Sequence, residues 1–83
     1  KEPSSADKFM KIFRNTVLSI RSAENLIIVK TEQGSASAAA EFIDRLDYDE
    51  ILGVIAGDNT IFVAIDSLDN VARVVENLEN ILK

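Results

Sequence analysis

The chain has 83 residues, 47% of them hydrophobic, and a formal net charge of −5 from nine Lys and Arg against fourteen Asp and Glu. This size predicts one domain, and the absence of Cys and His excludes disulfides, the usual transition-metal sites and the commonest catalytic nucleophiles and bases. An acidic chain is a poor match for nucleic-acid phosphates, and every apolar run is far shorter than the ~20 residues of a membrane span.

The chain begins with a polar stretch that we interpret as a linker remnant over residues 1–8, which leaves 9–83 as the folded domain. A short helix is predicted near 6–14, because four side chains recur at the spacing i, i+3, i+4, i+7: Phe9, Ile12, Phe13 and Thr16.

Two strands are predicted next, over 17–21 and 26–31. The second is the clearest β-branched run of the chain, and residues 22–25 have the composition of a turn. The two strands therefore pair as a hairpin.

A second helix is predicted to begin after Gly34, with Ser35 at its start. Its apolar stripe is rich in alanine and comprises Ala36, Ala39, Ala40, Ile43 and Leu46. The opposite side carries Ser37, Glu41 and Asp44, with Arg45 beside them. Such a polar stripe is usually a solvated face.

A second hairpin is predicted where an apolar run beginning at Ile51 and a second run over 61–65 flank Gly57-Asp58-Asn59-Thr60. Asp and Asn tolerate positive φ, so Asp58-Asn59 is the expected two-residue loop. It presents a carboxylate and a carboxamide at the tip. Local chemistry alone leaves two roles open for this pair, forming the turn or binding a ligand.

A last helix is predicted after the cap Asp66-Ser67, with an apolar stripe of Leu68, Val71, Ala72, Val75, Leu78, Ile81 and Leu82. The order (α)ββαββα predicts an α+β two-layer domain, a four-stranded, mostly antiparallel sheet with two helices on one face. The strands over 26–31 and 61–65 are apolar on both faces, which predicts a second buried surface, most simply against another subunit.

Three segments together carry a resemblance to the C-terminal domain of the bacterial arginine repressors: Thr31-Glu32-Gln33-Gly34-Ser35-Ala36, Asp44, and the run ILGVIAGDNTIFV over 51–63. The resemblance covers roughly residues 15–82. It implies trimers that pair into hexamers, with L-arginine as corepressor between the trimers and no other cofactor. It also implies a winged helix-turn-helix domain before Lys1 that binds operator DNA, a cytoplasmic location and no membrane.

The resemblance further implies which residues contact L-arginine: Asp58, Asn59, Asp44, Ala36, Ser37 and Ala56. A guanidinium presents five donors in a planar fork and favours carboxylates, and the ligand's α-carboxylate would be met by backbone N–H groups near 34–37. Three positions depart from the family. Asn59 stands where the family usually has Asp, Ser37 where it has Gln or His, and Val54 where Thr is frequent. Weakened arginine binding or an altered ligand preference is therefore expected.

Three hypotheses follow. The first is an arginine-sensing oligomerisation domain of a transcription regulator of arginine metabolism. The second is the oligomerisation module of a paralogous regulator in which arginine binding is weakened or lost. The third is an enzyme on a small α+β sheet, which the lack of His and Cys disfavours, since the acids Asp47, Asp49 and Glu50 form the only clustered carboxylates.

Overall fold

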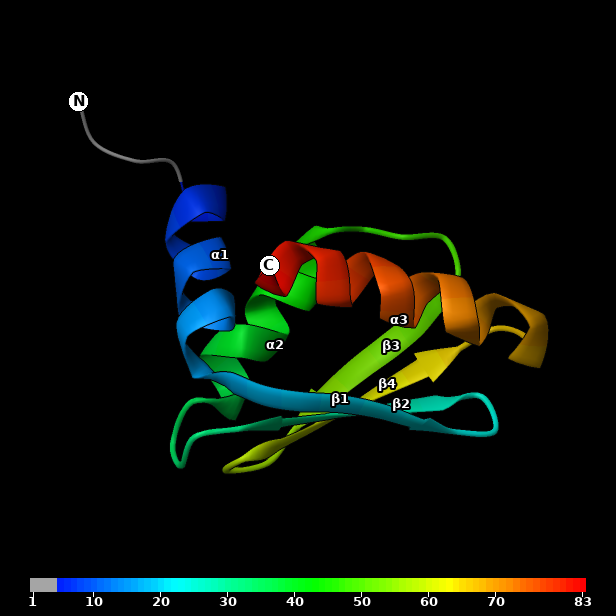
Figure 1. Ribbon diagram of the computed structural model, residues 1–83, viewed down its shortest axis with the longest axis horizontal. Helices are drawn as coiled ribbons and strands as arrows, with labels where there is room; N and C mark the ends of the chain where they lie inside the picture. Colours follow the sequence, from blue (N-terminus) through cyan, green and yellow to red (C-terminus); the bar gives the residue numbers. More distant parts are fainter. Residues whose placement is uncertain (1–4) are drawn as a thin grey trace.

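Four antiparallel strands and three helices make up residues 5–83, the part of the chain that the computed structural model describes (Figure 1). The elements are α1 Ser5–Thr16, β1 Val17–Ala23, β2 Leu26–Thr31, α2 Ala36–Arg45, β3 Ile51–Ala56, β4 Thr60–Ile65 and α3 Leu68–Leu82. This order confirms the predicted α+β fold, including the short N-terminal helix.

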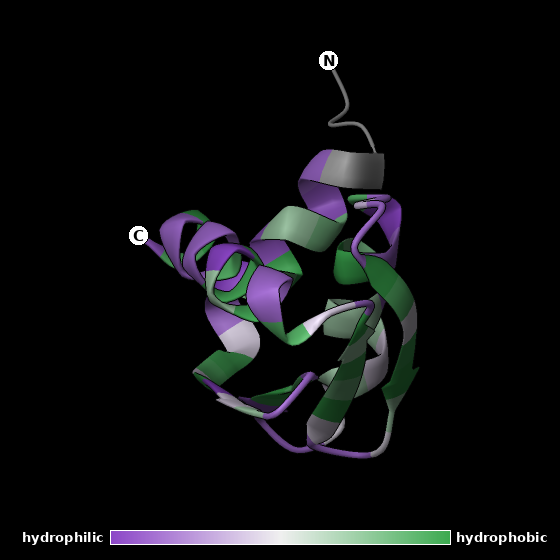
Figure 2. Ribbon diagram, turned by 90° about the vertical axis from the view of Figure 1, so that its right-hand side faces the viewer, coloured by the Kyte–Doolittle hydropathy of each residue, from purple (hydrophilic) through white to green (hydrophobic). Residues whose placement is uncertain are grey.

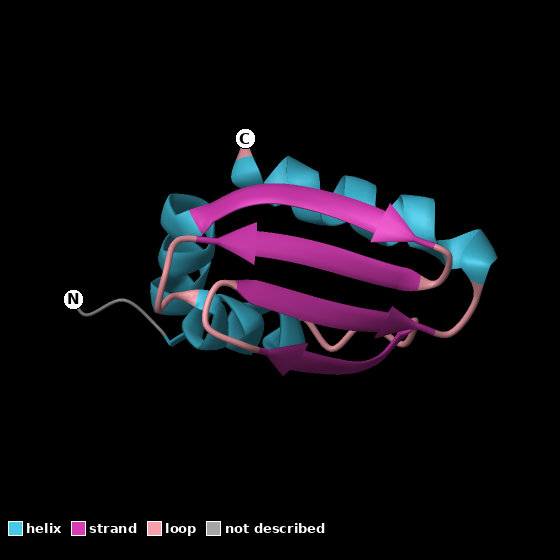
Figure 3. Ribbon diagram, turned by 90° about the horizontal axis from the view of Figure 1, so that it is seen from below, coloured by secondary structure: helices cyan, strands magenta, loops and turns pink. Residues whose placement is uncertain are grey.

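The sheet has the strand order β1-β2-β4-β3, so the two hairpins meet through their second strands (Figure 3). All three neighbouring pairs are antiparallel. Between the two central strands Val29 of β2 pairs with Ile61 of β4, and Ile61 in turn pairs with Ala56 of β3. The strand β3, which leads into the hairpin tip, is therefore an edge strand.

The helices α2 and α3 cover one face of the sheet (Figure 1). Alternate residues of the two central strands point into this layer and are fully or almost fully buried: Ile27, Val29, Thr31, Ile61, Val63 and Ile65. The helix α1 packs mainly on α2, where the rings of Phe13 and Phe42 lie 5.0 Å apart between centroids. One apolar core thus joins the sheet to all three described helices.

The other face of the sheet is not covered by any described helix (Figure 3). The cross-strand row Ile28, Phe62 and Ile55 runs across its centre, with Leu26 and Ala64 beside it. Ile55 is 72% exposed and Phe62 is 47% exposed. Hydrophobic residues dominate the strands, whereas hydrophilic residues dominate the turns (Figure 2). The apolar second face that the strand pattern predicted is therefore open in the single chain.

The structure corrects several predicted boundaries and faces. Residues 1–4 of the predicted linker lie outside the described residues, and the rest of it forms the first turn of α1, which is longer than 6–14. The strand β1 extends to Ala23 rather than to residue 21. In α3 the buried line contains Val74, whereas Leu68 and Ala72 of the predicted stripe are exposed. Among the described residues, no helix has the length and apolarity to cross a membrane.

Candidate ligand-binding site

The tip of the β3–β4 hairpin consists of Asp58 and Asn59, closed by a hydrogen bond from the Gly57 N–H to the Thr60 carbonyl at 2.8 Å. The tip was expected to use positive φ at these residues, but neither adopts it. The expected backbone conformation is wrong because contacts with another part of the chain, rather than the loop alone, set the tip's shape.

Those contacts come from the end of β2, the loop that follows it and the start of α2. The Asp58 carbonyl accepts hydrogen bonds from the N–H groups of Gly34 at 3.1 Å and Ala36 at 3.3 Å. The Asn59 carbonyl accepts one from the Thr31 N–H at 2.8 Å. Gly34 has φ +80°, which an L side chain rarely adopts. The main chain therefore fixes the hairpin tip against the first turn of α2 and leaves the side chains of Asp58 and Asn59 exposed.

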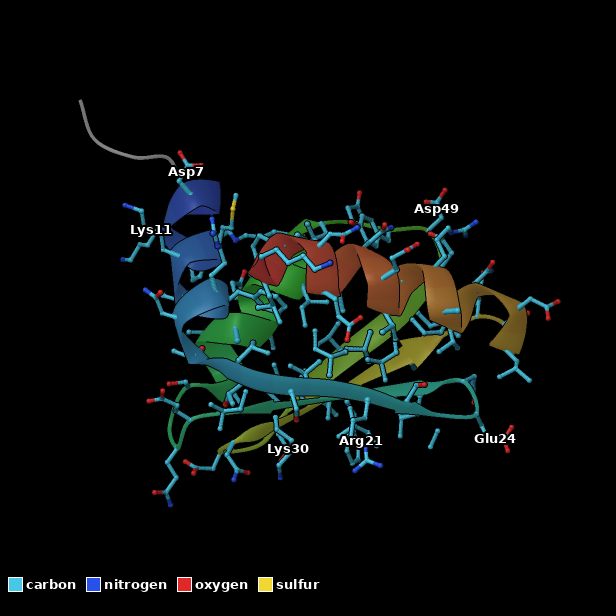
Figure 4. All side chains as sticks on the ribbon, viewed as in Figure 1. Asp7, Lys11, Arg21, Glu24, Lys30 and Asp49 are labelled. Carbon is cyan, nitrogen blue, oxygen red and sulfur yellow. The ribbon has the colours of Figure 1, made fainter. Side chains whose placement is uncertain are left out.

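The side chain of Asn59 belongs to a short hydrogen-bonded chain. The Lys30 ammonium donates to the Thr60 hydroxyl at 2.9 Å, and this hydroxyl donates to Asn59 Oδ1 at 2.9 Å. Lys30 and Arg21 project from the sheet face opposite the helices (Figure 4). A cation is therefore coupled through Thr60 to the tip, and the Asn59 amide presents its N–H₂ donors.

A cavity of about 260 Å³ lies between α2 and β3. Its lining residues are Ser37, Ala40, Glu41 and Asp44 from the helix and Val54, Ile55 and Ala56 from the strand. Residues three, four and seven apart share one face of a helix. The polar stripe of α2 therefore lines a hollow on an otherwise apolar wall, instead of facing only bulk solvent.

The structure brings together three of the six predicted contact residues, since Ser37, Asp44 and Ala56 all line this cavity. Asp58 follows Ala56 by two positions, and its carbonyl is bound at the start of α2. The hairpin tip therefore lies beside the end of the cavity that Ser37 and Ala56 line. Ala36 is fully buried, and its N–H already donates to Asp58. Glu41 also lines the cavity. The sequence pattern placed it on the polar stripe of this helix, but it was not among the predicted contacts.

The backbone donors expected for an α-carboxylate are mostly engaged in the single chain. Gly34 and Ala36 donate to Asp58, and Ser35 donates to the Glu32 carbonyl at 3.1 Å. The Ser35 side chain makes no capping hydrogen bond. The N–H groups of Ser37 and Ala38 are then the donors that the first turn of α2 leaves for another acceptor.

Two further hollows lie along α3 and on the open sheet face, and the second shares Val54 and Ile55 with the cavity. A groove of about 530 Å³ follows α3, and its lining residues include the apolar Leu68 and Val75 and the acidic Glu24, Glu76 and Glu79. An apolar hollow of about 300 Å³ lies on the open sheet face, between Leu26, Gly53 and Phe62. In residues 5–83 no group of three or more Asp and Glu side chains is placed to hold a metal ion.

Comparison with known proteins shows a match over residues 13–80 to the family described as "Arginine repressor, C-terminal domain". The chain is 44% identical over 78 residues to the arginine repressor of Clostridium novyi (strain NT), covering 94% of this chain and 52% of that protein. It is 51% identical over 70 residues to the arginine repressor of Thermotoga maritima, covering 84% and 46%. For the arginine repressor of Clostridium tetani the values are 39% over 82 residues, covering 99% and 54%. The chain thus spans about half the length of the relatives it matches.

Proposed function

We propose, from the premise that this chain belongs to the arginine repressor family and matches its C-terminal domain, that it senses L-arginine and oligomerises on behalf of a transcription regulator of arginine metabolism. The family is one of transcription regulators and not of enzymes. In this proposal trimers pair into hexamers in the bacterial cytoplasm, with L-arginine at the trimer–trimer interface. Operator DNA is bound by a separate N-terminal domain of the whole protein.

The observation that carries the arginine site is the cavity between α2 and β3 beside the fixed hairpin tip. Asp44 lies in its wall, and the Asp58 carboxylate is exposed at the adjoining tip. Carboxylates are the strongest partners of a guanidinium, especially where water is excluded. The exposure of both acids in the single chain is what a site completed by a second trimer requires. Asn59, Ser37 and Ala56 are proposed as further contacts, and Ala36 as the residue whose N–H holds the tip in place.

The open sheet face supports the oligomer. Its central row of Ile28, Phe62 and Ile55 is apolar, and two further large side chains, Leu18 and Leu52, are 66% and 69% exposed at the bulges of the edge strands. Exposed apolar faces of this kind mark protein–protein interfaces. We assign this face to the contact within the trimer.

A second candidate function is an oligomerisation module with weakened arginine binding. The hydrogen-bonded chain from Lys30 through Thr60 to Asn59 favours it, because the tip then carries one carboxylate with an ammonium nearby. A guanidinium gains less at such a tip than at one with two carboxylates.

The test combines isothermal titration of L-arginine with sedimentation of the same protein. The proposed function predicts saturable heat and a shift from trimer towards hexamer as arginine is added. D-arginine should give no saturable heat, or should bind with a much lower affinity than L-arginine, because the site is chiral. An oligomer that forms without arginine and gives no heat with it would support the second candidate instead.

A further inference from the structure

Glu41 gives the cavity a second carboxylate on the same helix wall as Asp44. The two residues are three positions apart in α2, and both line the hollow between this helix and β3. The other lining residues are Ser37, Ala40, Val54, Ile55 and Ala56, so the described wall carries two acids and no basic side chain. Its formal charge of about −2 near neutral pH favours a cationic ligand group over a neutral one of the same shape.

Glu41 already forms an ion pair with a guanidinium, that of Arg45 in the same helix. Arg45 Nε lies 3.2 Å from Glu41 Oε2, and the Arg45 guanidinium carbon lies 4.7 Å above the centre of the Phe9 ring. Arg45 is not among the residues that line the cavity. The contact with the Phe9 ring therefore holds its guanidinium outside the cavity. A carboxylate offers about four lone-pair sites, and this one contact with Arg45 leaves most of them for a ligand.

We infer that Glu41 is a specificity-determining residue of the arginine site and that Arg45 opposes its action. The inference rests on the proposed function and extends it to a residue outside the predicted contacts. Glu41 and Asp44 together select a charged guanidinium against a neutral ureido group. Arg45 competes for Glu41 and lowers the negative potential of the wall, which weakens ligand binding.

The direction in which arginine affinity changes distinguishes a ligand-binding role of Glu41 from a purely structural one. Glu41 and Arg45 form an ion pair between side chains that are each 46% exposed, at i and i+4 of α2. If the pair only supported the helix, then removing either partner would lower the stability by the same small amount and would change arginine affinity in the same direction, if at all. If Glu41 binds the ligand, then removing Glu41 weakens arginine binding and removing Arg45 strengthens it.

The experiment is titration calorimetry of the parent chain, Glu41→Gln, Arg45→Gln and the control Glu76→Gln, each with L-arginine and with L-citrulline. Citrulline replaces the guanidinium by a neutral ureido group of nearly the same shape. We expect Glu41→Gln to lose about threefold to tenfold in arginine affinity and less than about twofold in citrulline affinity. Arg45→Gln gains about twofold to fivefold for arginine. Glu76→Gln, on the far groove of α3, keeps the parent's values for both ligands.

Circular dichroism and sedimentation of each variant establish that the fold and the assembly are retained. If Glu41→Gln lost its fold, the opposite change in Arg45→Gln would still carry the test. A parent that binds no arginine overturns the proposed function and this inference together. A parent that binds arginine, with variants that leave the arginine-to-citrulline ratio unchanged or shift it in the same direction, overturns only the role of Glu41.

Discussion

The N–H of Ala36, the first residue of α2, donates to the carbonyl of Asp58 at the tip of the β3–β4 hairpin across 3.3 Å. The Gly34 N–H reaches the same oxygen, so one carbonyl occupies two donors at the start of the helix. The bond uses the Asp58 main chain and leaves its carboxylate free. A hairpin tip and a helix start that are distant in sequence thus become one rigid corner beside the cavity.

The corner depends on the backbone of Gly34, which has φ +80°. A Cβ added there meets no atom within 4 Å, so the effect of Gly34→Ala comes from the backbone conformation alone. We expect a loss of about 1–2 kcal/mol in the free energy of unfolding, measured by urea denaturation. Gly34→Asn is the matched control and should lose less, because Asn adopts this conformation more readily. Equal stability of the parent and the Ala variant would contradict this account.

The open sheet face should carry the assembly. Phe62→Asp places a charge in the middle of the apolar row, where burial against another subunit would leave it unpaired. We expect the parent to sediment as a trimer or larger at micromolar concentration, and Phe62→Asp as a folded monomer. Leu68→Asp is the control, since Leu68 is 61% exposed on α3, away from this face. A monomeric parent would remove the oligomer from the proposal, and an assembled Phe62→Asp would move the interface elsewhere.

Asp58→Asn should abolish detectable arginine binding and preserve the oligomer. Loss of one charged partner from a desolvated pair costs about 2–5 kcal/mol of binding free energy. The main-chain bonds from Gly34 and Ala36 to residue 58 do not involve the carboxylate, so the tip keeps its shape. Calorimetry measures the binding and sedimentation measures the assembly. Unchanged arginine affinity would mean that Asp58 serves only the turn.

Asn59→Asp should act in opposite directions on ligand binding and on ligand-free assembly. The new carboxylate can pair with the ligand's cation, which tightens arginine binding. Without ligand it adds negative charge where trimers are proposed to meet, which weakens the apo hexamer. Linkage then requires arginine to drive hexamer formation more strongly in the variant than in the parent.

Lys30 provides the control for this change, because its ammonium is linked through Thr60 to residue 59. Combining Lys30→Met with Asn59→Asp removes the nearby cation, so the apo hexamer should loosen further than in Asn59→Asp alone. Sedimentation across an arginine titration compares the three proteins. If arginine affinity and the apo hexamer fraction are the same in all of them, position 59 lies outside the site.

Much of the secondary structure follows from local patterns in the sequence. The β-branched run Leu26–Thr31 forms a strand with the predicted bounds, because its side chains suit an extended backbone wherever it packs. Ser67 caps α3 by accepting a hydrogen bond from the Asp69 N–H at 3.2 Å, and this contact spans only two residues. The apolar character of both faces of the central strands was also predictable, because successive side chains of a strand point to opposite faces of the sheet.

The packing and the site depended on partners that are distant in sequence. In α3, Val74 is buried and Leu68 is exposed, because the position of the helix over the sheet, not its own periodicity, selects the buried line. Phe42 was absent from the predicted stripe of α2 and is buried by contact with Phe13 of α1. The tip of Asp58 and Asn59 avoids positive φ because N–H groups between the end of β2 and the start of α2 donate to its carbonyls. Glu41 and Asp44 line a cavity rather than a plain solvated face because β3 lies opposite them. Helical spacing determines which side chains share a face, but only the neighbouring element determines what that face meets.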